Sequence, residues 1–466
     1  MIRLISPFFL FILMATASCG SDRKTTVQET SAASSPADKL AEGEVLRTVF
    51  CQADPSRSYA LYIPNKHEAS IPVLFLFDAH ARGYLPVEKY KDLADRYGFI
   101  LACSNNSKNG LAPDEILSLS STFFNDVLKR LPADTRNIFA GGFSGGARVA
   151  LGLAMQDERI KGVIANSAGF NPVKMPLRKE VCFVGVVGDG DFNLAELQNT
   201  QRNLNGTAQV NDLIIFNGSH EWAPAPDMDK AFLLLFLEGI RNGRIKKNDS
   251  IVSRSFLADQ KEADRIMKSG AGILSRASAC NLMVVYYDQI KPVEKYKTGL
   301  ATLRQSESFR KAKENELSLS QKEQELQSAY ARNLSEKDMK WWSVEVLKLR
   351  TEKKGDKESS SLNKRLLGYL SLVAYMNAND AMNQNSIPRA EQFLALYALV
   401  DPTNSEWAYL LSVLRLREND VDHSLESLKE AVRLGFNDVD RVHNQKEFQP
   451  LVNDARFNEI IAQIKA

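Results

Sequence analysis

A serine flanked by glycines is the first candidate for chemistry. Residues 142–146 read Gly-Phe-Ser-Gly-Gly and fit the pattern G-x-S-x-G. An apolar run at 136–141 precedes them, and a stretch with helical spacing at 147–155 follows. This context predicts a tight turn from a buried strand into a helix, with the Ser144 hydroxyl held out at the carboxyl edge of a sheet. The alternative is a plain turn in which Ser144 only caps the helix.

A histidine and two aspartates follow predicted strands farther along the chain. Asp189 and Asp191 come after one apolar run, and His220, one of only 5 histidines, comes after the next. The carboxyl ends of parallel strands share one edge of a sheet, so these side chains can meet Ser144 there. A serine hydroxyl needs an imidazole that accepts its proton and a carboxylate that orients the imidazole. We therefore expect a catalytic triad of Ser144, Asp191 and His220.

Asp189 is the alternative acid. Asp191 is preferred because it lies three residues past Gly188, which gives the chain room to bend toward the histidine. Two simpler interpretations stay open at this stage. Asp191 would then cap a helix over 192–204, and His220 would be an ordinary surface loop residue.

An oxyanion hole requires two backbone donors. The amide of Gly145, directly after the serine, is the first candidate. The second should lie in the loop 78–83, which fits a relaxed H-G-x-G with Ala81 in place of the first glycine. We assign this donor to Arg82, with Ala81 as the alternative, and expect His80 to brace the loop.

The segment 57–240 resembles the α/β-hydrolase superfamily, in particular its secreted polyester-depolymerase and feruloyl-esterase-like branch. The resemblance rests on the Ser-Asp-His chain order and on residues 80–83, 142–146, Asp191, His220, Glu221, Trp222 and Pro224. It implies cleavage of a carboxylic ester through an acyl-enzyme, without metal or organic cofactor. It also implies that Trp222 lines the pocket mouth, with simple packing as the alternative. The substrate is a small-molecule or polymer ester, and no substrate-binding module of a polymer depolymerase follows.

Alternating apolar runs predict an α/β fold with a mostly parallel sheet covered by helices. The expected strands are 57–63, 72–77, 99–103, 136–140, 162–166, 182–187 and 213–216, and the expected helices include 87–97, 114–131, 147–155 and 231–240. After residue 248 no strand pattern recurs. We expect a charged helical stretch over 309–353, with Trp341 and Trp342 in a core, and a polar linker over 353–361.

A pattern of small and large residues recurs near the C-terminus with a period of 34 residues. The matched pairs are Ala390 and Ser424, Leu394 and Leu428, Tyr397 and Ala431, and Pro402 and Phe436. This period is that of tetratricopeptide helix pairs, so 362–466 resembles a short tetratricopeptide domain. Such repeats bind segments of other proteins, which makes a protein partner an expectation. A generic helical bundle that braces the first domain is the alternative.

The N-terminus predicts export. One basic residue, an apolar run and small residues precede Cys19, as in a secretory signal. The site resembles a bacterial lipoprotein cleavage site, which would make Cys19 the lipidated first residue; a plain secretory signal is the alternative. We expect a lipid-anchored protein at the cell envelope.

Length and composition set limits on the number of domains and on the class of partner. The chain has 466 residues, is 44% hydrophobic and carries a formal charge of +2, which gives no reason to expect nucleic acid. We divide it into a signal peptide (1–18), a tether (19–44), an α/β-hydrolase domain (45–245), a helical connecting region (246–361) and the tetratricopeptide-like domain (362–466). The four other cysteines, whose pairing stays open, fit neither a disulfide scaffold nor a zinc site: Cys51, Cys103, Cys182 and Cys280.

Two other functions stay open. The same triad can cleave peptides, because an acyl-enzyme route serves both ester and peptide bonds. A non-catalytic envelope binding protein with a vestigial hydrolase domain is the third hypothesis.

Lipidation makes a prediction about location. Two or more acyl chains give stable membrane attachment without a spanning helix. We therefore expect the wild-type protein to fractionate with membranes, and Cys19→Ser to release it or to block its processing. A soluble wild-type protein whose mature N-terminus is not residue 19 would contradict lipidation.

Overall fold

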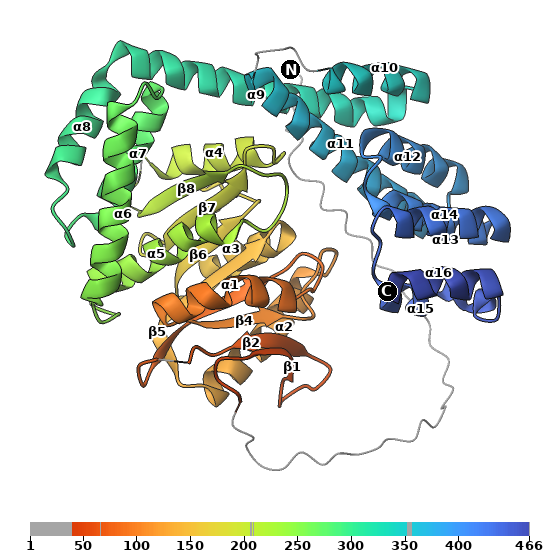
Figure 1. Cartoon of the computed structure of the whole chain (residues 1–466), viewed down its shortest axis with the longest axis horizontal. Coiled ribbons are helices and arrows are strands. Elements are labelled where there is room, and N and C mark those ends of the chain that lie inside the picture. Colours follow the sequence, from red (N-terminus) through yellow and green to blue (C-terminus); the bar gives the residue numbers. More distant parts are fainter. Residues whose placement is uncertain (1–39, 66, 206, 208, 352–356, 466) are drawn as a thin grey trace.

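The computed structural model describes residues 40–65, 67–205, 207, 209–351 and 357–465. The predicted signal peptide, the lipidation residue Cys19 and most of the predicted tether lie outside this range. Figure 1 shows an α/β unit, with helices from the second half of the chain along its left-hand side, its top and its right-hand side. No described helix is long and apolar enough to cross a membrane.

A mostly parallel sheet of eight strands forms the α/β unit, as predicted. Its strand order is β1-β2-β4-β3-β5-β6-β7-β8. The first two pairings in this order are antiparallel, and all the others are parallel. The strands are β1 (Val45–Phe50), β2 (Ser58–Tyr62), β3 (Ile71–Phe77), β4 (Ile100–Ser104), β5 (Ala133–Phe143), β6 (Ile160–Asn166), β7 (Cys182–Gly188) and β8 (Asn211–Phe216).

Helices cover both faces of the sheet, and each face has its own apolar core. One core joins the sheet to α1 and α5, and the other joins it to α2, α3 and α4. The bounds are α1 (Tyr84–Tyr97), α2 (Pro113–Arg130), α3 (Gly145–Gln156), α4 (Leu194–Leu204) and α5 (Ala225–Arg241). Strand β1 was not predicted, because its burial does not alternate cleanly and Phe50 is exposed.

The second half of the described chain is helical, as predicted. Its helices are α6 (Asp249–Lys268), α7 (Ile273–Tyr287), α8 (Glu294–Gln305), α9 (Glu307–Glu336), α10 (Met339–Arg350), α11 (Lys357–Asn383), α12 (Ile387–Val400), α13 (Ser405–Arg417), α14 (Val421–Arg433), α15 (Val439–Asn444) and α16 (Ala455–Lys465). The expected polar linker is wrong in its second part, since 357–361 belong to α11; residues 352–356 are not described.

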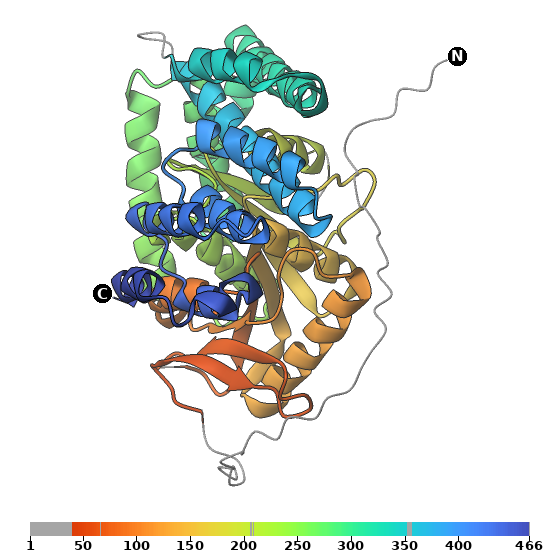
Figure 2. The ribbon, with the colours of Figure 1, turned by 90° about the vertical axis from the view of Figure 1, so that its right-hand side faces the viewer.

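Helices α6 to α8 extend one of the two sheet cores, and the later helices form cores of their own. Figure 2 shows α12 to α16 alongside the α/β unit. Trp342 is buried in one of these later cores beside Tyr330, as expected, whereas Trp341 is only partly buried.

The 34-residue repeat falls on two helices, α12 and α14. Three of the four matched pairs are buried on these helices: Ala390, Leu394 and Tyr397 in α12, and Ser424, Leu428 and Ala431 in α14; of the fourth pair, Phe436 is buried and Pro402 is exposed. The period therefore marks the inward faces of two alternate helices, with α13 between them. Cys51, Cys103, Cys182 and Cys280 are free thiols, and each is buried.

The turn from β5 into α3 has no room for side chains at its glycines. A Cβ on Gly142 would lie 2.3 Å from the carbonyl carbon of Gly146, and a Cβ on Gly146 would lie 2.0 Å from the carbonyl oxygen of Phe77. These contacts bring the end of β3 against the start of α3. Glycine is required here for a close approach of main chains.

This packing makes a prediction with a control in the same helix. Gly146→Ala should lower the free energy of unfolding by about 3 kcal/mol or more, because backbone must shift to admit the methyl group. Gly152 in α3 has open space where its Cβ would lie, so Gly152→Ala should raise the free energy by about 0.5–1 kcal/mol. Denaturant unfolding followed by circular dichroism measures both. Equal stabilities would show that the close approach is not required.

Candidate active site

Three strand ends bring the predicted triad together. Ser144 follows β5, Asp191 follows β7 and His220 follows β8. The Nε2 atom of His220 lies 3.0 Å from the Oγ of Ser144, and its Nδ1 atom lies 3.0 and 3.1 Å from the two carboxylate oxygens of Asp191. An ionised carboxylate only accepts hydrogen bonds, so Nδ1 carries the proton. Nε2 is then free to accept the serine proton.

The two aspartates of the acid loop have different partners. Asp191 is fully buried against the imidazole. Asp189 is exposed, and its Oδ1 accepts a hydrogen bond from the amide of Gly218 at 3.2 Å. The Oδ1 of Asp191 also accepts from the amide of Asn193 at 2.9 Å. Asp191 therefore faces the histidine and also fixes the main chain just before α4.

The serine main chain is strained. Ser144 has φ 54° and ψ −118°, a conformation that non-glycine residues rarely adopt. Among the described residues, its side chain makes no capping hydrogen bond to α3. The hydroxyl instead faces His220, so the alternative in which Ser144 is only a helix cap does not describe this turn.

Asn166, at the end of β6, was missed in the sequence. Its main-chain oxygen accepts the amide of Ser144 at 2.8 Å. Its side chain accepts from the amide of Ala223 at 2.9 Å and donates to the carbonyl of Glu221 at 3.2 Å. One fully buried side chain thus joins the serine turn to the loop that carries His220. No local pattern distinguishes this asparagine from any polar residue at a strand end.

Asp78, at the end of β3, is a second missed residue. Its fully buried carboxylate accepts from the Nε1 of Trp222 at 2.8 Å, from the Nε of Arg82 at 3.0 Å and from the amide of His80 at 2.9 Å. Burial by itself would raise the pKa of Asp78, but the hydrogen bond and charge of Arg82, together with the bond from Trp222, hold this pKa below its usual range. The carboxylate ties the loop 78–83 to the histidine loop.

These bonds correct two predictions. The amide of Arg82 donates to Asp78 at 3.3 Å, so it is already engaged and is not presented as an oxyanion donor. The amide of Ala81, the alternative, donates to the Asp78 carbonyl at 3.3 Å. Trp222 is buried between Tyr90 and Phe143 and does not line a pocket mouth. The Asp78 carboxylate, at the start of the loop, therefore engages both the Arg82 amide and the Trp222 indole, whereas Ala81 bonds to the Asp78 main chain.

Ala81 has φ 60°, in the left-handed region that favours glycine. The glycine of the H-G-x-G pattern would be unstrained at this position. Gly145, the other predicted donor, lies next to the loop 105–110: a Cβ on Gly145 would lie 1.7 Å from the Oδ1 of Asn109. The amide of Asn109 in turn donates to the carbonyl of Ala79 at 2.9 Å.

Aromatic rings flank the imidazole of His220. Its ring centroid lies 4.3 Å from that of Phe192, which is stacked on it, and 4.8 Å from that of Phe143. The histidine side chain is 22% exposed. The imidazole is therefore held between apolar walls while one side of it stays open to solvent.

Comparisons with known proteins give structural neighbours only. No family model matches the sequence, and no curated protein matches it. An S-formylglutathione hydrolase (FrmB) from Staphylococcus aureus is 12% identical over 39% of this chain and 90% of its own, with a TM-score of 0.33. A ferulic acid esterase is 17% identical over 42% and 97%, with a TM-score of 0.34. A truncated carbohydrate esterase from gut microbiota is 11% identical over 43% and 98%, with a TM-score of 0.36.

The buried carboxylate of Asp78 makes a prediction about stability. Asp78→Asn should lower the free energy of unfolding at pH 7 by about 2–3 kcal/mol, because donors from Arg82 and Trp222 lose an acceptor. The folded-state pKa of Asp78 is depressed, so its stabilising contribution is present above about pH 4 and is lost as pH falls further. Denaturant unfolding at pH 7 and at pH 3 should therefore show a smaller difference at the lower pH.

The control for this prediction is Asp422→Asn. It weakens an ion pair with Arg456 in which the two side chains are 80% and 58% exposed, and it should cost less than about 1 kcal/mol. A loss for Asp78→Asn no greater than that of the control, or one that does not shrink at low pH, would contradict the role given to Asp78.

Proposed function

We propose that this chain is a serine hydrolase that cleaves a carboxylic ester through an acyl-enzyme intermediate. The observation that carries the proposal is the continuous hydrogen-bonded chain from Ser144 through His220 to Asp191. The strained serine turn at the carboxyl edge of a parallel sheet supports it, because such a turn exposes the nucleophile. Stored backbone strain is common at functional sites.

The first half-reaction forms the acyl-enzyme. The Oγ of Ser144 attacks the ester carbon while the Nε2 of His220 takes the hydroxyl proton. Asp191 stabilises the imidazolium that forms. The tetrahedral intermediate then collapses: the bond to the alcohol oxygen breaks, and His220 gives the proton to the departing alcohol. The acyl group stays on Ser144.

The second half-reaction releases the acid. A water molecule gives a proton to His220 and attacks the acyl carbon. The bond to Ser144 breaks, and the proton returns to its Oγ. The proton transfers use only groups of the triad and one water molecule. The overall reaction converts an ester and water into a carboxylic acid and an alcohol.

The negative oxygen of each intermediate requires donors from the main chain. We assign the first to the amide of Gly145. Among the loop amides from 79 to 82, those of His80, Ala81 and Arg82 already donate to Asp78. Ala79 is therefore our second candidate, and it lies two residues beyond the end of β3, the strand whose last carbonyl lies against Gly146.

Peptide cleavage is the second candidate function, because the same acyl-enzyme route serves both bonds. A panel of p-nitrophenyl esters and aminoacyl anilides separates the two by the leaving group that is released. The extended hydrogen bonding around the triad favours both enzymatic hypotheses over a vestigial hydrolase domain.

Location and partners form part of the proposal. The sequence before Cys19 supports attachment of the mature chain to the cell envelope by a lipid anchor. The buried 34-residue repeat in α12 and α14 supports a tetratricopeptide-like arrangement. We propose that this arrangement offers a surface for a protein partner. The substrate is then an ester that reaches the envelope.

A fluorophosphonate probe tests the enzymatic proposal. We expect stoichiometric covalent labelling of Ser144 in the folded full chain, abolished by Ser144→Ala and by His220→Ala. Mass spectrometry of the labelled peptide identifies the residue. Folded wild-type protein that takes up no label would refute both the esterase and the peptidase hypotheses.

The two aspartates provide a matched pair of variants for the same test. Asp191→Asn should lower turnover of an activated ester by about 10⁴-fold, because the imidazole would lose its orientation and its tautomer. Asp189→Asn should have a small effect, because its side chain bonds to the amide of Gly218 instead. A larger loss for Asp189→Asn would reassign the acid.

A further inference from the structure

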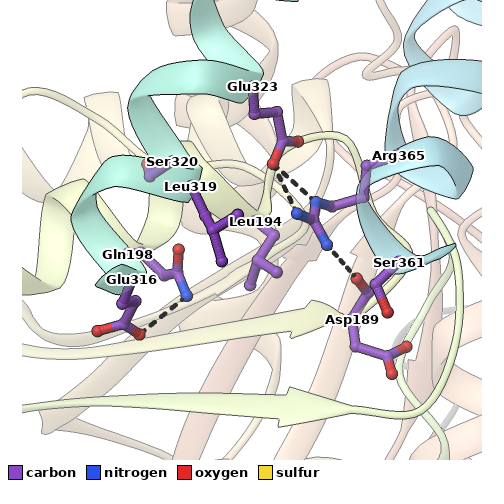
Figure 3. A pocket seen from close by; sticks show the side chains of 9 residues that line it. All are labelled: Asp189, Leu194, Gln198, Glu316, Leu319, Ser320, Glu323, Ser361 and Arg365. Carbon is purple, nitrogen blue, oxygen red and sulfur yellow. Dashed lines mark hydrogen bonds and ion pairs between the residues drawn. The ribbon is translucent and has the colours of Figure 1, made fainter. Parts of the chain in front are cut away.

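The acid loop is held from two sides. On the inner side, the amides of Asp189 and Gly190 donate to the carbonyls of Phe216 and Gly218 at 2.8 and 2.9 Å. These bonds come from β8 and the histidine loop, within the α/β unit. On the outer side, helices α9 and α11 of the second half of the chain reach the same loop, as Figure 3 shows.

Arg365 in α11 makes the first outer contact. Its Nη1 atom donates to the carbonyl oxygen of Asp189 at 3.1 Å. The Nε and Nη2 atoms both face the Oε2 of Glu323 in α9, each at 2.8 Å. The planar guanidinium thus connects a helix of the second half of the chain to the main chain two residues before Asp191.

The second outer contact lies one residue after Asp191. Gln327 in α9 donates from its Nε2 atom to the carbonyl of Phe192 at 3.3 Å. Gly368 in α11 lies beside the Phe192 ring: a Cβ at this glycine would lie 3.4 Å from it, in van der Waals contact. That ring is stacked on the imidazole of His220. The helices therefore hold the loop on both sides of the triad acid.

The ion pair between Glu323 and Arg365 is buried, with 1% and 9% of the two residues exposed. Burial raises the pKa of Glu323, although Arg365 acts against this. Among the described residues, the Oε1 of Glu323 has no hydrogen-bond partner. A cavity of about 270 Å³ adjoins the pair and is also lined by Asp189 and Leu194. A buried pair with an unpaired oxygen contributes little net stability, and the best-attested role of such pairs is to fix one geometry.

We propose that Arg365 is a positioning residue for the triad: it fixes the main chain at Asp189 and thereby the carboxylate of Asp191 against His220. The helical second half of the chain is then part of the catalytic unit. The catalytic consequence rests on the proposed function, whereas the effect on the loop does not.

Kinetics of full-chain variants provide the first test. Arg365→Met should lower kcat for an activated ester about tenfold with KM unchanged, because the acid is misplaced while the substrate site is not. Arg365→Lys should lose less, since it keeps the charge and one donor. The control is Arg417→Met, which breaks a similar arrangement between Glu447 and the carbonyl of Met382 away from the acid loop. Its kcat should equal that of wild type.

A double-mutant cycle separates positioning from a merely structural role. If Arg365 acts through Asp191, Arg365→Met should change kcat by less than about twofold in an Asp191→Asn background. A full tenfold loss in that background would overturn the proposal. A kcat equal to that of wild type in the single variant would overturn it as well, while leaving labelling of Ser144 and the proposed function intact.

Hydrogen exchange tests the positioning without any activity. Asp189, Gly190 and Asp191 donate their amides within the acid loop and its neighbours. Arg365→Met should speed exchange of these amides about tenfold or more relative to both wild type and Arg417→Met, while β8 keeps its protection. Unchanged exchange over 188–193 in a folded variant would overturn the proposal even if the chain has no esterase activity.

Discussion

The main chain at Ser144 is the point on which the other features of the site depend. Its positive φ costs about 1–3 kcal/mol and persists only where surrounding structure leaves no alternative. Here the constraint is visible on every side. The main-chain oxygen of Asn166 accepts a hydrogen bond from the Ser144 amide. The carbonyl oxygen of Phe77 lies against Gly146, and the carbonyl group of Gly146 lies against Gly142. The ends of strands β3, β5 and β6 therefore all contact the turn at Ser144, and these contacts fix the direction of its hydroxyl.

Local chemistry explains why the meeting of Ser144, His220 and Asp191 could be predicted from the sequence. The glycines around Ser144 are required by contacts within a few residues or with an adjacent strand, so they leave a pattern. The spacing of Asp191 beyond Gly188 separated it from Asp189, and the two do have different partners. The period of 34 residues marked buried helix faces because a helix pair of constant length brings equivalent inward positions back at that interval.

Interactions between distant residues explain what could not be predicted. Asp78 and Trp222 are 144 positions apart, and nothing near either residue indicates their bond. That bond, together with the bonds from Arg82, changed both the expected oxyanion donor and the expected pocket residue. Similarly, the polar composition of 357–361 suggested a linker, although these residues begin a long helix. Exposed first turns of helices are often polar, so composition alone does not separate the two.

The second half of the chain adds a physical constraint to the first. A parallel sheet brings loops to one edge but leaves each loop its own freedom, since only its ends are fixed by strands. The histidine loop is fixed by Asn166 and Asp78 from within the α/β unit. The acid loop has inner bonds as well, yet its outer face is covered by α9 and α11. If the loop needs both faces to keep Asp191 in place, unfolding of the helices would lower activity before the sheet itself unfolds. On the function proposed above, stability of the helical part and turnover would then be linked through the acid loop.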